Sequence, residues 1–118
     1  MRSAFASVIV PLLLALPVPA GALSANDCRW VEGRLSAYNG TPTFRIWPKG
    51  TRRLLGVVSR SGMSDGADLL PPKVSRMGPS FDHDLWGSFR VCPKIPERAG
   101  WMRMVVVTDA RHLTARER

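Results

Sequence analysis

A histidine flanked by two aspartates, in the segment Phe81-Asp82-His83-Asp84, is the arrangement in this sequence with the most direct chemical meaning. An imidazole beside carboxylates can bind a metal ion or act as general acid and base in a hydrolysis. Neighbouring side chains in a loop rarely converge on one point, which favours a solvated histidine here. The second histidine, His112, follows Arg111 and is expected to be exposed. A hydrolase with a site near 82–84 is therefore the weakest of three functional hypotheses.

Other catalytic and metal-binding signatures are absent from the 118 residues. No serine stands in a G-x-S-x-G motif, and there is neither an H-E-x-x-H motif nor a phosphate-binding loop. The two cysteines and two histidines lack the paired spacing of a zinc site, and no C-x-x-C motif suggests redox chemistry. The sequence predicts a protein that is not an enzyme and that uses neither a metal nor a cofactor.

The arginines are more informative. The chain has 17 Lys and Arg residues against 9 Asp and Glu residues, which gives a formal net charge of +8. Most of the basic residues are arginines, whose planar and always charged guanidinium binds phosphate, sulfate or carboxylate groups. Six basic or aromatic residues are predicted to share the polar side of the strands and to form a ligand-binding face: Arg34, Tyr38, Arg45, Trp47, Arg90 and Arg103.

Such a face has a functional and a structural interpretation. A basic sheet surface with aromatic platforms is how small β-barrels hold single strands or oligosaccharides. The first hypothesis is thus a non-catalytic binding or interaction module for an anionic polymer or another anionic component of the cell envelope. Exposed strand faces are also charged simply to block edge-to-edge pairing. The second hypothesis is therefore a structural or stress-related envelope protein with no specific ligand, and in either case we expect a monomer.

Alternation of apolar and polar residues predicts the elements that position these side chains. The expected strands are 30–38, 43–47, 51–58, 86–92 and 101–109, and the last can continue through 113. Pro71-Pro72 is expected to open a helix of one or two turns over 73–77, and Gly78-Pro79 to end it. Ten strand residues are predicted to be buried: Val31, Leu35, Phe44, Ile46, Leu55, Val57, Phe89, Val91, Met104 and Val106.

Three strands, a short helix and two further strands follow one another in the order of an OB-fold, a small five-stranded, partly open β-barrel. A small β-sandwich built from the same strands is the alternative. The length and composition predict one all-β domain over 23–113, followed by a flexible tail at 114–118.

The first 22 residues have the pattern of a secretory signal peptide. Arg2 precedes an apolar segment over 4–16, and Ala20-Gly21-Ala22 forms a small-residue cleavage site. An uncleaved membrane anchor is the alternative, but the segment is interrupted by prolines and is shorter than the roughly 20 apolar residues that span a bilayer. We predict a periplasmic or secreted protein, cleaved after Ala22 or else after Ala20 or Ala25. No second long apolar segment follows, so no membrane insertion is expected after cleavage.

In an oxidising compartment, Cys28 and Cys92 are expected to form one disulfide. Cys28 is in phase with the polar residues of the first strand, and Cys92 is in phase with Arg90 in the fourth. A bond between two outward positions is consistent with adjacent strands.

Several short segments carry a family resemblance: Cys28, Glu32–Leu35, Asn39-Gly40, Arg45–Trp47, Gly50–Leu54 and Gly87–Pro93. Over about residues 28–107, the chain resembles small exported proteins of Gram-negative bacteria, a family with no assigned activity. The shared motifs are strands, turns and the cysteine pair. The resemblance implies export and fold, and it adds no catalytic residue.

Overall fold

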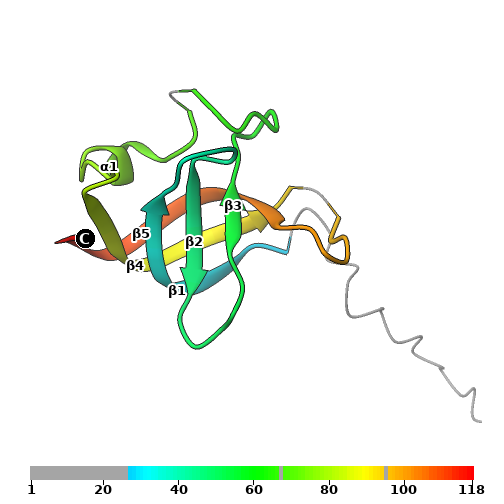
Figure 1. The fold of residues 1–118 in the computed structure, drawn as a ribbon, viewed down its shortest axis with the longest axis horizontal. Coiled ribbons are helices and arrows are strands. Elements are labelled where there is room, and N and C mark those ends of the chain that lie inside the picture. The colour runs from blue at the N-terminus through cyan, green and yellow to red at the C-terminus, as the bar shows by residue number, and fades with distance from the viewer. Residues whose placement is uncertain (1–26, 67, 95) are drawn as a thin grey trace, which may run out of the picture.

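The computed structural model describes residues 27–66, 68–94 and 96–118. Its elements are β1 (Arg29–Ala37), β2 (Phe44–Pro48), β3 (Leu55–Val57), α1 (Pro72–Ser75), β4 (His83–Pro93) and β5 (Arg103–Glu117). The strands pair in the order β1-β2-β3-β5-β4, and β4 pairs back with β1, which closes the sheet into a barrel (Figure 1). Neighbouring strands are antiparallel except β3 and β5, which are parallel.

The predicted five-stranded all-β barrel with a helix after the third strand is confirmed. The ring of strands is closed rather than partly open, and membership of the OB-fold stays a prediction.

Two glycines that face each other allow the strands to approach closely where the barrel curls. Gly33 in β1 is paired with Gly87 in β4. A Cβ atom on Gly33 would lie 2.0 Å from the backbone oxygen of Trp47 in β2, and one on Gly87 would lie 2.9 Å from the backbone oxygen of Arg111 in β5. Both positions therefore require a residue without a side chain.

The core fills the barrel and extends under α1. Its buried members are Leu35, Ile46, Leu55, Val57, Leu69, Leu70, Val74, Leu85, Phe89, Val91, Val105, Val107 and Ala110. Six of the ten predicted core residues are among them, and Val31 and Phe44 are partly buried against the cluster. Val74 of α1 is fully buried, so the helix closes one end of the barrel, the end at which the C-terminus also lies (Figure 1). Pro72 suits the first turn of this helix, where no amide donor is needed.

The predicted orientation of β5 is wrong by one residue. Val105 and Val107 are buried, whereas Met104 and Val106 are only partly covered. Apolar residues occupy both faces of this strand, so alternation alone cannot assign its phase. Pairing with β3 decides it, because Val105 lies opposite the buried Val57 and paired positions point to the same side of a sheet.

Three strands also have an end that differs from the prediction by three residues or more. β3 begins at Leu55 rather than 51 because the preceding residues form a turn: Thr51 donates from its backbone N and its Oγ1 to the carbonyl oxygen of Pro48. Such local bonds compete with strand pairing. β5 continues to Glu117, which is paired with His83, so residues 114–117 belong to the barrel instead of a flexible tail. Residues 114–117 pair with β4 because that strand starts at His83, three residues earlier than predicted.

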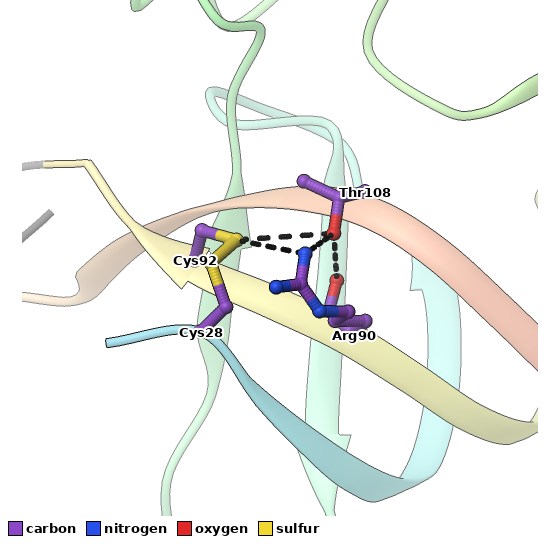
Figure 2. The surroundings of a disulfide bond; sticks show 4 residues. All are labelled: Cys28, Arg90, Cys92 and Thr108. Carbon is purple, nitrogen blue, oxygen red and sulfur yellow. Dashed lines mark hydrogen bonds between the residues drawn. A yellow bond between two sulfur atoms is a disulfide. The ribbon is translucent and has the colours of Figure 1, made fainter. Parts of the chain in front are cut away.

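The predicted disulfide between Cys28 and Cys92 is confirmed, with the two Cα atoms 4.1 Å apart. It joins the start of β1 to the end of β4. Figure 2 shows Arg90 beside it, where Nη1 donates to Thr108 Oγ1 at 2.9 Å and to the Cys92 sulfur at 3.8 Å. The bond therefore lies on the outer surface of two adjacent strands, as the phase of both cysteines indicates.

The predicted signal peptide at 1–22 and its three candidate cleavage sites lie outside the described residues. Within the described ranges, no helix is both long enough and apolar enough to cross a membrane.

Candidate anion-binding face

Aromatic rings and guanidinium groups alternate across the outer surface of the barrel. Arg34 of β1 is paired with Trp47 of β2 on one side and with Trp86 of β4 on the other. Its guanidinium carbon lies 5.4 Å from the ring centroid of Trp47 and 5.7 Å from that of Trp86. Arg116 of β5 continues the series, with its guanidinium carbon 5.2 Å from the Trp86 centroid. We call Trp47, Arg34, Trp86 and Arg116 the arginine–tryptophan row.

The rings, rather than carboxylates, hold the two arginines of this row. Trp47 and Trp86 meet edge to face, with centroids 6.1 Å apart and planes at 86°. Each cation–π contact contributes about 0.5–1 kcal/mol at an exposed site. The Nε of Arg34 is buried and has no hydrogen-bond partner within the described part of the chain. Across the described ranges, neither Arg34 nor Arg116 forms an ion pair, so their charges are not neutralised by the protein.

A second aromatic contact lies just beyond the end of β1, where Tyr38 stands between two arginines. The guanidinium carbon of Arg45 lies 4.7 Å from the Tyr38 centroid, and that of Arg118 lies 5.6 Å from it. Arg118 is held by Asp84, whose Oδ1 accepts from Nε at 2.8 Å, and by the carbonyl oxygen of Ala37. Arg45 donates from Nε to the carbonyl oxygen of Pro42 at 3.1 Å. This cluster places one further arginine, Arg45, on the same surface of β2 as Trp47.

The structure thus brings four of the six predicted face residues into two contacts, Arg34 with Trp47 and Arg45 with Tyr38. Arg90 also points outward, but it lies four residues along β4 from Trp86, roughly 13 Å at the rise of a strand. Its guanidinium is already hydrogen-bonded to Thr108 beside the disulfide. It is therefore part of the surroundings of the disulfide rather than of the row.

Arg103 is not on this face, and its predicted position is wrong. Its side chain is only 7% exposed, and Nη1 lies 3.0 Å from Glu97 Oε2. The error follows from the phase of β5, because Arg103 alternates with the buried Val105 and lies opposite the buried Leu55. Arg103 belongs to one end of the barrel.

Two residues of the row were not anticipated. Trp86 is in phase with Ser88 and Arg90 of β4, so strand alternation alone was sufficient to place it on the outer face. Arg116 follows an irregularity in the pairing of β4 with β5, where His112 has a φ of 56°. No local pattern in the sequence marks that irregularity, so the sequence does not show where the side chain of Arg116 lies.

The Asp82-His83-Asp84 segment does not form a compact site. Asp84 is buried against Arg118, and His83 begins β4 opposite Glu117. In the part of the chain that the structure describes, no group of three or more His, Cys, Asp and Glu side chains is arranged to hold a metal ion. The geometry adds no support to the hydrolase hypothesis.

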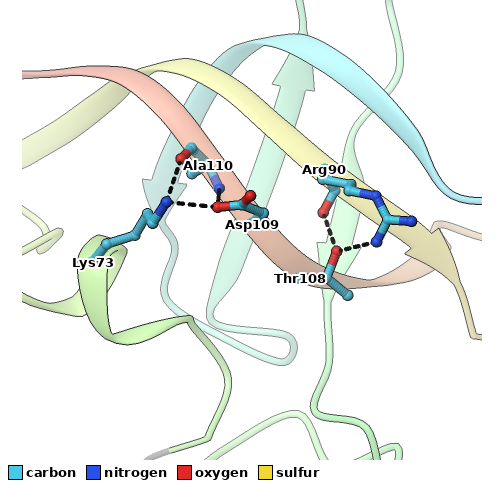
Figure 3. A network of polar contacts seen from close by, with 5 residues as sticks. All are labelled: Lys73, Arg90, Thr108, Asp109 and Ala110. Atoms are coloured by element: carbon cyan, nitrogen blue, oxygen red, sulfur yellow. Dashed lines mark hydrogen bonds and ion pairs between the residues drawn. The ribbon is translucent and has the colours of Figure 1, made fainter.

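A polar network fixes α1 to β5 on another side of the barrel (Figure 3). Lys73 Nζ lies 2.7 Å from Asp109 Oδ1 and donates to the carbonyl oxygen of Ala110 at 3.2 Å. The hydrogen bond from Lys73, followed by that from the backbone N–H of Ala110, lowers the pKa of the Asp109 carboxyl. Lys73 therefore holds α1 against β5 through its ion pair with Asp109. The charges of Arg34 and Arg116, by contrast, have no carboxylate partner in the described ranges.

Comparison of the chain with protein-family models, curated proteins and solved structures finds no match. The function must therefore be argued from the barrel and from the chemistry of its surface.

Proposed function

We propose that this protein is a non-catalytic binding module for an anionic polymer, and that the arginine–tryptophan row is the centre of its binding surface. The observation that carries the proposal is that Arg34 and Arg116 are held on tryptophan rings and, among the described residues, are not paired with carboxylates. A guanidinium fixed on a ring keeps its full charge. Its N–H groups remain available for charge-assisted hydrogen bonds to an oxyanion.

The same contacts favour recognition through guanidinium groups over stacking on the tryptophans. Arg34 lies against both rings, and Arg116 lies against Trp86, so protein cations already cover part of the ring surface on which a base or sugar would stack. Phosphate, sulfate and carboxylate groups match the fork of an arginine in two-point contacts. A polymer that carries such groups along its length is therefore the partner that this surface fits best.

The predicted export of the protein supports a partner in the cell envelope. The Cys28–Cys92 disulfide is of the kind that persists in oxidising compartments such as the periplasm or the extracellular space. The N-terminal pattern at 1–22 is that of a signal peptide. We therefore propose a periplasmic or secreted monomer whose partner is an anionic polymer of that compartment.

A structural role is the second candidate, and the contacts of the row themselves favour it. Rings and cations alternate across four strands, and each contact adds to the cohesion of the barrel. In this alternative the protein is a structural or stress-related envelope protein, and its positive surface has no specific ligand.

Binding of heparin, a sulfated polysaccharide, separates the two candidates. The double variant Arg34→Gln/Arg116→Gln is compared with Arg60→Gln/Arg76→Gln, which removes the same charge from a separate groove beside α1 and β5. The proposal predicts a loss of affinity of about tenfold or more for the first variant, the equivalent of about 1.4 kcal/mol. The control is expected to lose much less, and circular dichroism should show that both variants are folded. Equal losses would show that net charge alone attracts the polymer, and the structural role would then be preferred.

A further inference from the structure

We propose a second binding site in this protein, for a compact oxyanion such as the phosphate or carboxylate group of a small molecule. It is a cleft of about 280 Å³ at the barrel end where β3 and β5 begin. Its walls include Arg52, Arg53, Trp101, Met102 and Arg103. No residue of the arginine–tryptophan row lines it, so the site does not depend on the proposed function.

Arg103 is the central residue of this site because its guanidinium is buried and only partly paired. Its side chain is 7% exposed, and Nη1 pairs with Glu97 Oε2 at 3.0 Å. The other terminal nitrogen, Nη2, is buried and has no hydrogen-bond partner among the residues that the structure describes. A buried donor that lacks a partner is costly, and more so when it is charged. An oxyanion in the cleft would supply the missing acceptor.

The carboxylate of Glu97 already binds two arginines of the cleft, Arg53 and Arg103. Its Oε1 is bound by Arg53, and its Oε2 by Arg103, so one carboxylate bridges two guanidinium groups. The hydrogen bond from Arg53, then the charge of Arg53, and then those of Arg103 and Arg29 lower the pKa of the Glu97 carboxyl. The carboxylate of Glu97 therefore acts as an internal oxyanion that satisfies part of the cluster.

The cluster retains positive charge after this pairing. Arg52 lines the same cleft, and Arg98 stacks on the Trp101 wall with its guanidinium carbon 4.5 Å from the ring centroid. The excess of guanidinium groups over the Glu97 carboxylate favours an anion over a neutral or cationic ligand. The volume lies just below the roughly 300–1,000 Å³ of drug-sized sites, which favours a compact ligand.

The outer wall of the cleft can admit such a ligand. The side chain of Arg53 is 68% exposed, and Trp101 is 66% exposed. A surface arginine of this kind can turn from Glu97 towards an incoming anion without disturbing the core. The ligand would then lie between Arg53 and Arg103, beside Trp101.

Titration of the disulfide-bonded chain with inorganic phosphate, and separately with acetate, tests the site by NMR. We expect saturable shifts of the Trp101 indole N–H and the Arg103 Nε–H, and the tighter of the two probes identifies the preferred anionic group. Sodium chloride at matched ionic strength is the control. Shifts that increase linearly without saturation for both probes, or that chloride reproduces, would overturn the proposal.

Variants give a second readout that does not depend on the buried arginine. Arg53→Gln, at an exposed side chain, is expected to weaken binding of the preferred probe by about tenfold. Arg76→Gln, outside the cleft, should leave it unchanged. Glu97→Gln should strengthen it, because an internal competitor is removed. Wild-type affinity in Arg53→Gln, or weaker binding in Glu97→Gln, would contradict the site. The cleft contains no residue of the row, so failure of this site would leave the proposed function unaffected.

Discussion

Two groups of arginines in this barrel are held in place by different chemistry. On the outer face, Arg34 and Arg116 lie against tryptophan rings and keep their full charge. At the barrel end, Arg53 and Arg103 converge on the carboxylate of Glu97. Rings orient a guanidinium without neutralising it, whereas a carboxylate orients it and cancels part of its charge. The first arrangement therefore suits an extended polyanion on an open surface, and the second suits a compact anion in a cleft.

Removal of the disulfide is expected to have the largest effect on stability, and to affect the two arginine groups unequally. The double variant Cys28→Ser/Cys92→Ser should lower the free energy of unfolding by about 4 kcal/mol, because the bond closes a loop between residues 64 apart in sequence. Urea denaturation measures this change. Cys28 directly precedes Arg29, whose charge acts on Glu97, so the barrel end should loosen more than the outer face. A loss below about 1 kcal/mol would mean that the barrel holds this end without the bond.

A smaller but still substantial loss is expected for Gly33→Ala. The new Cβ atom would lie 2.0 Å from the backbone oxygen of Trp47, so β1 and β2 must separate. Overpacking of this kind costs about 1–3 kcal/mol. Because Gly33 adjoins Arg34, the variant should also weaken heparin binding while the phosphate response of Trp101 persists. An unchanged melting temperature would contradict the close approach of these two strands.

The ring that holds both arginines of the row can be removed without a change in charge. Trp86→Ala should reduce heparin affinity by roughly threefold to tenfold, since Arg34 and Arg116 lose the ring that orients them and only Arg34 keeps a second ring contact, with Trp47. Trp101→Ala, at the barrel end, is the matched control and should bind heparin as the wild type does. Affinity measured by isothermal titration calorimetry checks both. Equal heparin affinities for the two variants would show that the Trp86 ring does not orient Arg34 and Arg116 for binding.

The smallest effect is expected for the ion pair that ties α1 to β5. The pKa of Asp109 is lowered below its ordinary value of 3.8 in the folded chain, so its pairing with Lys73 stabilises the fold fully above that value. This contribution is lost as the pH falls below about 4, through the lowered pKa. Asp109→Asn should therefore lower the melting temperature slightly at pH 7 and make no difference near pH 2. A difference that persists at pH 2 would point to a cause other than this charge.

The sequence predicted most of the barrel but only part of the face. Alternation identified β1, β2 and β4, and the phase of Cys28 and Cys92 agreed with their bond. It failed in β5, where apolar residues lie on both faces and only pairing with β3 fixes which side is buried. That failure is why Arg103 was wrongly predicted to lie on the face. The pairing irregularity near His112 kept Arg116 from being found, because it depends on contacts between strands and not on a local pattern.

The salt dependence of heparin binding tests the central claim most directly, because its slope measures how many charged contacts are made. With Arg34, Arg45 and Arg116 as contacts, the slope of log affinity against log salt should be roughly −2 to −3, at about 0.7–0.9 per contact. Arg34→Gln/Arg116→Gln should make this slope shallower by about 1.5. Arg60→Gln/Arg76→Gln should leave it unchanged. Identical slopes for the two double variants would contradict the claim that the arginine–tryptophan row binds the polymer.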